Sequence, residues 1–195
     1  MDVMRGRDGF YIVEAMVALG LLVFGFLGFV ALLSNSLSLN RVATHAYIGN
    51  FLALEGIELV KNTVDANIMY RQNFGNDACE WNSGFMKQDP GDAEEFEIDW
   101  SLAPMSGSCP GDSIRSKPFF GGEGTPLRLD ENGRYGYLGG EDTVFRRRVR
   151  VVTVPAPDGE ESYELRVNSI VTWTTRGGAQ FEVNTEDHLF NWQRR

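Results

Sequence analysis

Residues 9–14 read GFYIVE and residues 15–33 read AMVALGLLVFGFLGFVALL, so one acid, Glu14, directly precedes nineteen residues without charge. The next charged residue is Arg41, and the chain has no proline before Pro90. Nineteen helical residues measure roughly 28 Å, close to the thickness of the hydrocarbon layer of a bilayer. No polar face interrupts the run, as it would in a helix that borders a soluble core. We therefore predict that this stretch spans a membrane as a helix.

The composition excludes several classes of protein. The chain has 195 residues, with 18 Lys and Arg against 27 Asp and Glu, and a net charge of −9. This length fits one domain with an appendage. A hydrophobic content of 43% and a charged content of 23% exclude a disordered chain. The acidity argues against a protein that coats nucleic acid, and two cysteines and two histidines are too few for a disulfide-dense scaffold or a His-rich metal site.

The segment from Gly9 to Glu14, followed by the apolar run, resembles the processing signal of type IV pilins and pseudopilins. That signal is a short polar leader ending in Gly, then Phe, then Glu at the fifth mature position, then a long apolar stretch. The resemblance implies that residues 1–9 form a leader. A prepilin peptidase would cut between Gly9 and Phe10 and then methylate the new amine of Phe10. It also implies that Glu14 pairs with a subunit's terminal amine during assembly.

Other interpretations of this N-terminus stay open. A secretory signal peptide could be cut after Ser36, but its apolar region would be only 7–15 residues long and would carry no acid at its head. A plain signal anchor does not explain Glu14 either, unless this acid only marks the membrane interface. The chain also departs from the family pattern, which often has a proline partway along the helix, because Ala31 stands in about that place.

The resemblance implies a structural subunit, a minor pilin or pseudopilin, of a type IV pilus or a type II secretion-like filament. It places the chain in the cytoplasmic membrane with a single span and the head outside the cytoplasm, and in an extracellular filament after assembly. The implied partners are the prepilin peptidase, the major pilin and other minor pilins, the inner-membrane assembly platform and, before assembly, the lipid bilayer. No cofactor is implied. The alternatives are a pilus-tip module for adhesion or DNA uptake, and a signal-anchored exported enzyme.

The helix is predicted to continue beyond its membrane and filament-core half, residues 10–34, through an amphipathic half, residues 35–68. Residues 52–67, LALEGIELVKNTVDAN, also resemble the helix end of minor-pilin-like sequences. A helix from Phe10 to about Asn67 would be roughly 85 Å long. Small or apolar residues recur along the second half at steps of three and four and form one stripe. The small ones would allow either the close approach of a sheet or ordinary packing. The stripe consists of Val42, Ala46, Gly49, Ala53, Gly56, Ile57, Val60 and Val64.

Residues 69–126 are rich in turn-forming residues and are predicted to be a variable loop region with one strand at residues 95–100. Cys79 and Cys109 fall in this region. Because the implied topology places both outside the cytoplasm, where disulfides persist, we expect them to be bonded, with two free thiols as the alternative. Six acids here could bind calcium, but they lack a calcium-loop motif, which favours a solvated acidic loop. They are Asp89, Asp92, Glu94, Glu95, Glu97 and Asp99.

Residues 127–195 are predicted to form an antiparallel sheet. A hairpin joins residues 127–129 to residues 135–137, and three further strands follow at residues 145–154, 163–175 and 179–183. The fold class is thus α+β: a type IV pilin-like fold in which a long N-terminal helix packs on a C-terminal sheet. One strand face is expected to pack on the helix stripe: Tyr163, Leu165, Val167, Val171 and Trp173. The chain end is expected to cover a sheet edge with Leu189, Phe190 and Trp192.

Arg146, Arg148 and Arg150 alternate on one face of a predicted strand, with Arg147 on the other. The three could contact DNA phosphates, but the net charge favours cross-strand pairing with acids such as Glu164 and Glu182. The sequence lacks the nucleophile-elbow, zinc-protease, P-loop and dinucleotide-binding motifs, so no enzymatic activity is predicted.

Overall fold

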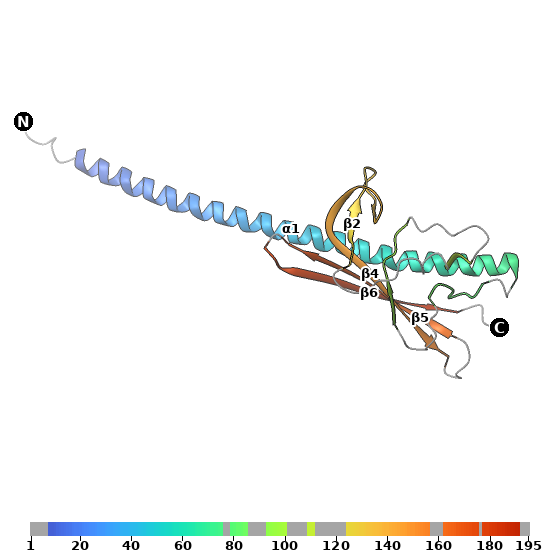
Figure 1. Ribbon diagram of the computed structural model, residues 1–195. Helices are drawn as coiled ribbons and strands as arrows, with labels where there is room; N and C mark the ends of the chain where they lie inside the picture. The colour runs from blue at the N-terminus through green and yellow to red at the C-terminus, as the bar shows by residue number, and fades with distance from the viewer. Residues whose placement is uncertain are drawn as a thin grey trace, which may run out of the picture. The chain divides into compact units, whose positions relative to one another are not determined.

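The computed structural model of the chain describes residues 8–75, 79–85, 93–100, 109–111, 124–156, 162–175 and 177–191. Within them lie one long helix, α1 (Asp8–Phe74), and six later strands (Figure 1). The layout is therefore α+β, as predicted. The chain divides into two compact units, Met1–His45 and Ala46–Arg195. The strands are β1 (Ala93–Phe96), β2 (Pro126–Leu129), β3 (Tyr135–Gly136), β4 (Glu141–Pro155), β5 (Ser162–Thr174) and β6 (Gln180–Phe190).

The first unit contains the part of α1 that ends at His45. Every residue from Phe10 to Arg41 is exposed, except Gly20, which is half-buried. In the described part of the chain, α1 is the one helix long and apolar enough to cross a membrane. This unit therefore has no core of its own, and its apolar side chains point outward on all sides of the helix.

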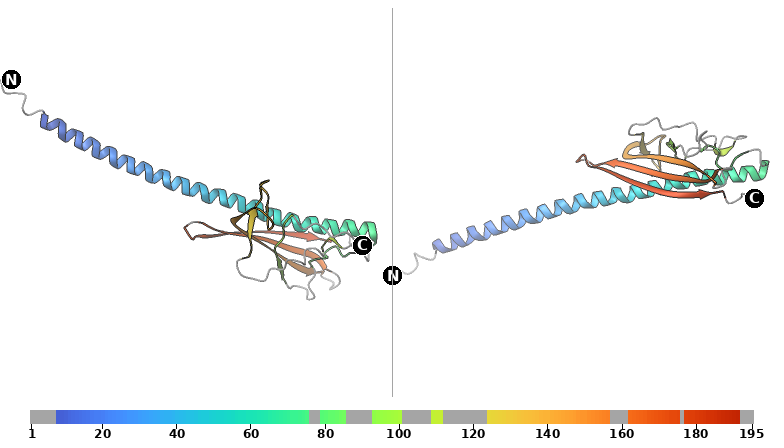
Figure 2. Two further views of the ribbon diagram at one scale, coloured as in Figure 1. Left: turned by 45° about the horizontal axis from the view of Figure 1, so that its top comes forward. Right: turned by 90° about the horizontal axis from the view of Figure 1, so that it is seen from below.

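The second unit is built on an antiparallel sheet with the strand order β3-β2-β4-β5-β6. The central strand, β4, pairs with β5 along one side. Its other side pairs with β2 near its start and with β1 farther along. The strand β6 lies at one edge and pairs only with β5, from Thr174 opposite Gln180 to Glu164 opposite Phe190. Residues 46–74 of α1 lie along this sheet (Figure 2).

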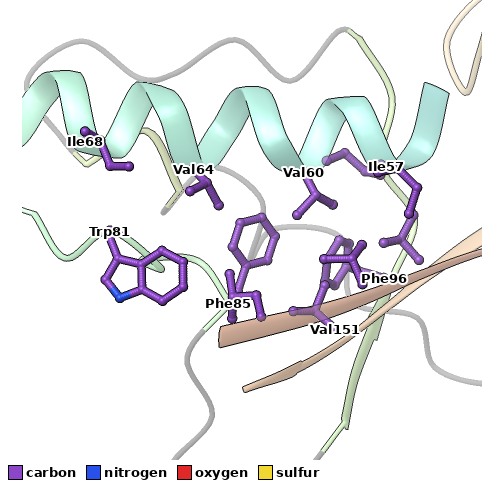
Figure 3. Packing of buried hydrophobic residues seen from close by; sticks show 12 residues of the cluster. Ile57, Val60, Val64, Ile68, Trp81, Phe85, Phe96 and Val151 are labelled. Atoms are coloured by element: carbon purple, nitrogen blue, oxygen red, sulfur yellow. The ribbon is translucent and has the colours of Figure 1, made fainter. Parts of the chain in front are cut away.

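Two hydrophobic clusters join the sheet to the predicted stripe of α1. The larger contains Ile57, Val60, Val64 and Ile68 of the helix together with inward-facing side chains of β4 and β5. Figure 3 shows the rings of Trp81 and Phe85 on the side of α1 that carries these residues. The smaller cluster combines helix and strand residues nearer the start of the second unit: Leu52, Ala53, Leu127, Phe145, Val171 and Trp173. The expected packing of one β5 face on the helix stripe is confirmed, except that Tyr163 is 40% exposed.

Glycine on the stripe allows the helix and the sheet to approach closely. A Cβ built on Gly49 would lie 2.7 Å from Cζ3 of Trp173. A Cβ on Gly56 would lie 2.2 Å from Oγ of Ser169, closer than real Cβ atoms come to a neighbour, and 3.1 Å from its Cβ, which is a tight contact. Of the two interpretations left open for the small residues, close approach of the sheet is thus the correct one at these two positions.

Besides the start of β4, which is Glu141 rather than residue 145, three predicted boundaries differ from the structure. The helix does not end near Asn67 but continues to Phe74, because its apolar stripe extends to Ile68 and the first helix-ending residue is Gly75. Gly75 has a φ of 102°, and its N–H donates to the carbonyl of Arg71, as in a left-handed C-terminal cap. The first strand is Ala93–Phe96 rather than residues 95–100, because pairing with β4 begins at Ala93 and stops at Phe96.

The third difference concerns the end of the chain. We expected Leu189 and Phe190 to cover a sheet edge, but both belong to β6, which is itself the edge strand. The alternation of the strand simply continues past Val183, because β5 is long enough to pair with eleven residues of β6. Trp192, the third residue of that prediction, lies outside the described residues.

Replacing Gly56 with valine should destabilise the second unit by about 1–3 kcal/mol, because the added side chain overlaps Ser169. The measurement is thermal unfolding of the full-length protein in detergent, followed by near-UV circular dichroism. Asn62→Val, an exposed position on the same helix, is the matched control and should change stability by less than about 0.5 kcal/mol. Adding Ser169→Gly to Gly56→Val should restore part of the loss. Equal stability of Gly56→Val and the wild type would refute the close approach.

Candidate functional site

The predicted processing and assembly residues lie in the first turns of α1. Phe10, the implied first mature residue, is 80% exposed. Glu14 lies one turn later, on the same helix face as Phe10, Val17 and Leu21, which border a shallow groove with it. Within the described residues, Glu14 makes no hydrogen bond or ion pair. If this helix enters lipid, a carboxylate among apolar side chains at its start is costly unless a partner arrives from outside the chain.

The surface of α1 from Ala15 to Leu33 offers almost only apolar side chains. No charge occurs between Glu14 and Arg41, and the large side chains of this stretch are about half exposed or more. Monomeric proteins in water do not leave apolar patches of this extent uncovered. Lipid, or the apolar helices of other chains, would cover it. The most exposed large side chains between Glu14 and Arg41 are Met16, Leu21, Phe24, Leu32 and Leu39.

The three arginines of the predicted stripe lie on the face of β4 turned away from α1, which confirms their alternation. They are opposite Thr172, Ile170 and Asn168 of β5. The suggested pairing with Glu164 is wrong, because the carboxylate of this β5 residue binds His188 on β6 instead. Glu182, the other suggested partner, lies in one groove with Arg146 and Arg148 but forms no ion pair with them in the described structure. Arg150 is exposed.

Arg147, on the opposite face, is a residue whose role the sequence did not reveal. Its guanidinium is fully buried between the sheet and α1. Nη1 donates to Glu55 Oε2 at 2.9 Å and to the Leu52 carbonyl at 3.1 Å, and Nη2 donates to the Ile98 carbonyl at 2.7 Å. The arginine therefore links β4, α1 and the segment after β1. Two residues of the sequence could have indicated this role. Gly56, a small residue on the stripe, leaves room for a long buried side chain, and the neighbouring Glu55 supplies an acceptor for a cation.

Tyr137 completes this network from the loop after β3. Its hydroxyl donates to the backbone carbonyl of Arg147 at 2.9 Å, and its N–H donates to Asp99 Oδ2 at 2.8 Å. Burial raises the pKa of Tyr137, so the hydroxyl stays protonated and remains a donor. Tyr137 thus ties the loop after β3 to β4 through its hydroxyl and to the segment after β1 through its backbone N–H.

Cys79 and Cys109 form a disulfide with a Cα–Cα distance of 5.4 Å, as expected. The bond closes a separation of 30 residues, which in the chain-entropy account contributes about 3–4 kcal/mol to stability. It ties the segment that follows α1 to the segment that precedes β2. The alternative of two free thiols is excluded.

Asn67 holds the backbone beside this disulfide and was also not predicted. Its side chain is completely buried on α1. Nδ2 donates to the carbonyls of Trp81 and Ser83, and Oδ1 accepts the N–H of Gly111 at 2.8 Å. One amide therefore satisfies three backbone groups of the two loop segments that the disulfide joins.

The acids considered for calcium do not gather into a site. Asp99 is buried and bound to Tyr137, which corrects the expectation that it belongs to a solvated loop. Glu97 accepts the N–H of Thr125, and Glu95 lies opposite Arg150 in the sheet. Asp89 and Asp92 lie outside the described residues. Among the residues that the structure does describe, no group of three His, Cys, Asp or Glu side chains could hold a metal ion.

His188 forms the most concentrated group of titratable side chains on the outer face of β5 and β6. Nδ1 lies 2.5 Å from Glu164 Oε1 and Nε2 lies 3.2 Å from Glu186 Oε1. The hydrogen bond to Glu164 raises the pKa of His188 above its ordinary value, with a smaller contribution from Glu186. Arg166, opposite His188 in the register, is the nearest cation of the sheet.

Comparison with known proteins found no match, whether with family models, with curated proteins or with solved structures.

Arg147→Ala should destabilise the second unit by about 3–5 kcal/mol, because it leaves Glu55 and two buried carbonyls without their donor. The measurement is unfolding of the full-length protein in detergent, monitored by tryptophan fluorescence. Arg150→Ala, on the same strand but exposed, should cost less than about 0.5 kcal/mol. If the two variants lose the same amount of stability, the buried network does not have the role described.

The pKa of His188 should fall toward its ordinary value in Glu164→Gln, because the neutral amide no longer stabilises the imidazolium. A raised pKa in the folded state means that this pair adds stability below about pH 6.5 and loses it as the pH rises through the folded pKa. An NMR titration of the two histidines measures the pKa directly, with His188→Gln to assign the signals. An unchanged pKa in Glu164→Gln would contradict the pairing.

Proposed function

We propose that this chain is a structural subunit, a minor pilin or pseudopilin, of a type IV pilus or a type II secretion-like filament. In this proposal a prepilin peptidase removes residues 1–9, and the chain then joins the filament through α1. The observation that carries the proposal is the position of Glu14. It is an acid without a partner among the described residues, in the fifth position after Gly9, at the head of a helix that is apolar on every side.

The apolar half of α1 supports a subunit that moves from lipid into a bundle of helices. Because lipid is as apolar as the helix, this transfer gains little hydrophobic energy, and close packing must supply the affinity. Gly20, Gly25 and Gly28 favour such packing, since nothing lies within 4 Å of a Cβ built at any of them. These positions would let a neighbouring helix approach closely, much as Gly49 and Gly56 do for the sheet.

The charge at Glu14 would supply the specificity. Cleavage after Gly9 creates a cationic amine on Phe10, at the same end of the helix as Glu14. In surroundings of low dielectric, an amine and a carboxylate attract far more strongly than in water. An incoming subunit whose amine meets an unpaired Glu14 removes the cost of two isolated charges. Helices that pack in another register would leave the amine and the carboxylate apart, so the cost of two isolated charges would remain.

The second unit supports a head that stands outside the cytoplasm. The disulfide between Cys79 and Cys109 is typical of oxidising compartments. The network around Arg147 and the clusters on α1 hold the head to the second half of the helix. The outer sheet face, with exposed side chains on β6, would then be displayed on the filament.

Replacing Glu14 with leucine should leave cleavage and membrane insertion intact but lower the share of the protein in sheared filaments at least about tenfold. The reason is that an ion pair worth about 1.4 kcal/mol or more is lost. The measurement is quantitative immunoblotting of membrane and filament fractions from the native host. Glu58→Leu is the matched control, an exposed acid farther along α1 whose ion pair in the described structure is with Lys61. Filament incorporation of Glu14→Leu at the wild-type level would overturn the proposal.

A further inference from the structure

The face of the sheet turned away from α1 carries a groove with a volume of about 280 Å³. Most of its lining residues belong to β4, β5 and β6, which are neighbours in the sheet. This volume is close to the lower limit of small-molecule sites, about 300 Å³. Six polar side chains of the outward-facing strand positions line it: Arg146, Arg148, Thr172, Thr174, Gln180 and Glu182.

Arg148 is one of the groove residues for which the described part of the chain provides no hydrogen bond or ion pair. Its Nε is buried and has no hydrogen bond, and its guanidinium forms no ion pair within the described residues. The other arginines nearby are bound: Nε of Arg146 donates to the Gly124 carbonyl, and Arg147 binds Glu55. Arg148 is half-buried, and its Nε is a buried donor without an acceptor, so the guanidinium can take an acceptor that comes from outside the chain.

The two ends of the groove differ in chemistry. In the register, Arg146 lies opposite Thr172, which lies opposite Glu182, so one row crosses the groove from cation through hydroxyl to carboxylate. Neighbouring strands are about 4.8 Å apart, which separates the β4 and β6 ends by about 10 Å. The β4 end offers guanidinium donors. The β6 end offers Glu182, which only accepts hydrogen bonds, and the amide of Gln180.

We propose that this groove binds a small organic carboxylate that also carries hydroxyl groups, of the class of acidic sugars. The ligand's carboxylate lies against Arg148, where the guanidinium fork forms two parallel hydrogen bonds. Its hydroxyl groups donate to Glu182 and exchange hydrogen bonds with Thr172 and Gln180. This assignment does not depend on the proposed filament function.

A polyanion fits the same surface less well. A nucleic-acid strand would follow the row of arginines along β4, but Arg150 is not part of the groove. It would also face Glu182 and the exposed Glu186 on β6, in a protein with a net charge of −9. These negative charges repel a chain of phosphates, whereas one carboxylate bound at the β4 end avoids them.

The test is binding of D-glucuronate to the full-length protein in detergent micelles, by isothermal titration calorimetry. For a ligand of this size we expect a Kd of about 1 mM or lower. The neutral sugar D-glucose and the plain carboxylate acetate should each bind at least about tenfold more weakly, because each lacks one of the two recognised groups. Saturable glucuronate binding with this order of affinities supports the proposal. Glucose or acetate binding as tightly as glucuronate would overturn it, and so would no glucuronate binding at about 20 mM.

Variants separate the groove from the rest of the face. Arg148→Gln should weaken glucuronate binding at least about tenfold, and Glu182→Gln should reduce the preference for glucuronate over acetate. Arg150→Gln is the matched control and should stay within about twofold of the wild type. Near-UV circular dichroism spectra show that each variant is folded. An equal loss of glucuronate affinity in Arg148→Gln and Arg150→Gln would overturn the proposed site. Tight binding of a DNA duplex that both variants abolish would also overturn it, because it indicates a general basic surface.

Discussion

The absence of charge between Glu14 and Arg41 imposes the constraint on which the rest of the molecule depends. A helix that is apolar on all sides cannot remain in water, so this part of α1 requires lipid or other helices around it. After Arg41 the same helix becomes one-sided and carries a stripe that a sheet can cover. One continuous helix thus changes from a stretch that could cross a membrane to a stretch that packs on a sheet.

Two features hold the head on the helix: small residues of α1 that allow close packing, and a buried arginine of β4 that binds acceptors of α1. Glycines at positions 49 and 56 let Trp173 and Ser169 approach the backbone of α1, which larger residues would prevent. Arg147 occupies the space beside Gly56 and binds acceptors from the helix and from the segment after β1. Burying a cation this deeply is unfavourable unless several acceptors surround it, so the arginine also specifies how the layers fit together. Asn67 has the corresponding role for the loop segments joined by the disulfide.

The sequence predicted those features of the fold that follow from a periodic pattern of apolar residues. Steps of three and four from Ala46 to Val64 predicted the buried face of α1, and alternation in β4 and β5 predicted which side chains face it. The partners of individual polar residues were not predictable, because they come from distant segments. Arg147 meets Glu55 across 92 positions, and Glu164 meets His188 rather than an arginine because the register of β6 brings it there. The sequence also could not show that Nε of Arg148 has no acceptor among the described residues, because that depends on all the neighbours of β4.

The central claim, that the N-terminus is processed for assembly, is tested most directly by the first residue of the mature protein. Tandem mass spectrometry of the N-terminal fragment, from protein extracted from the membranes or filaments of its host, measures both its identity and its modification. The account predicts a chain that begins at Phe10 and carries one methyl group on its amine. A mature chain that begins at Met1 or at Leu37 would contradict it.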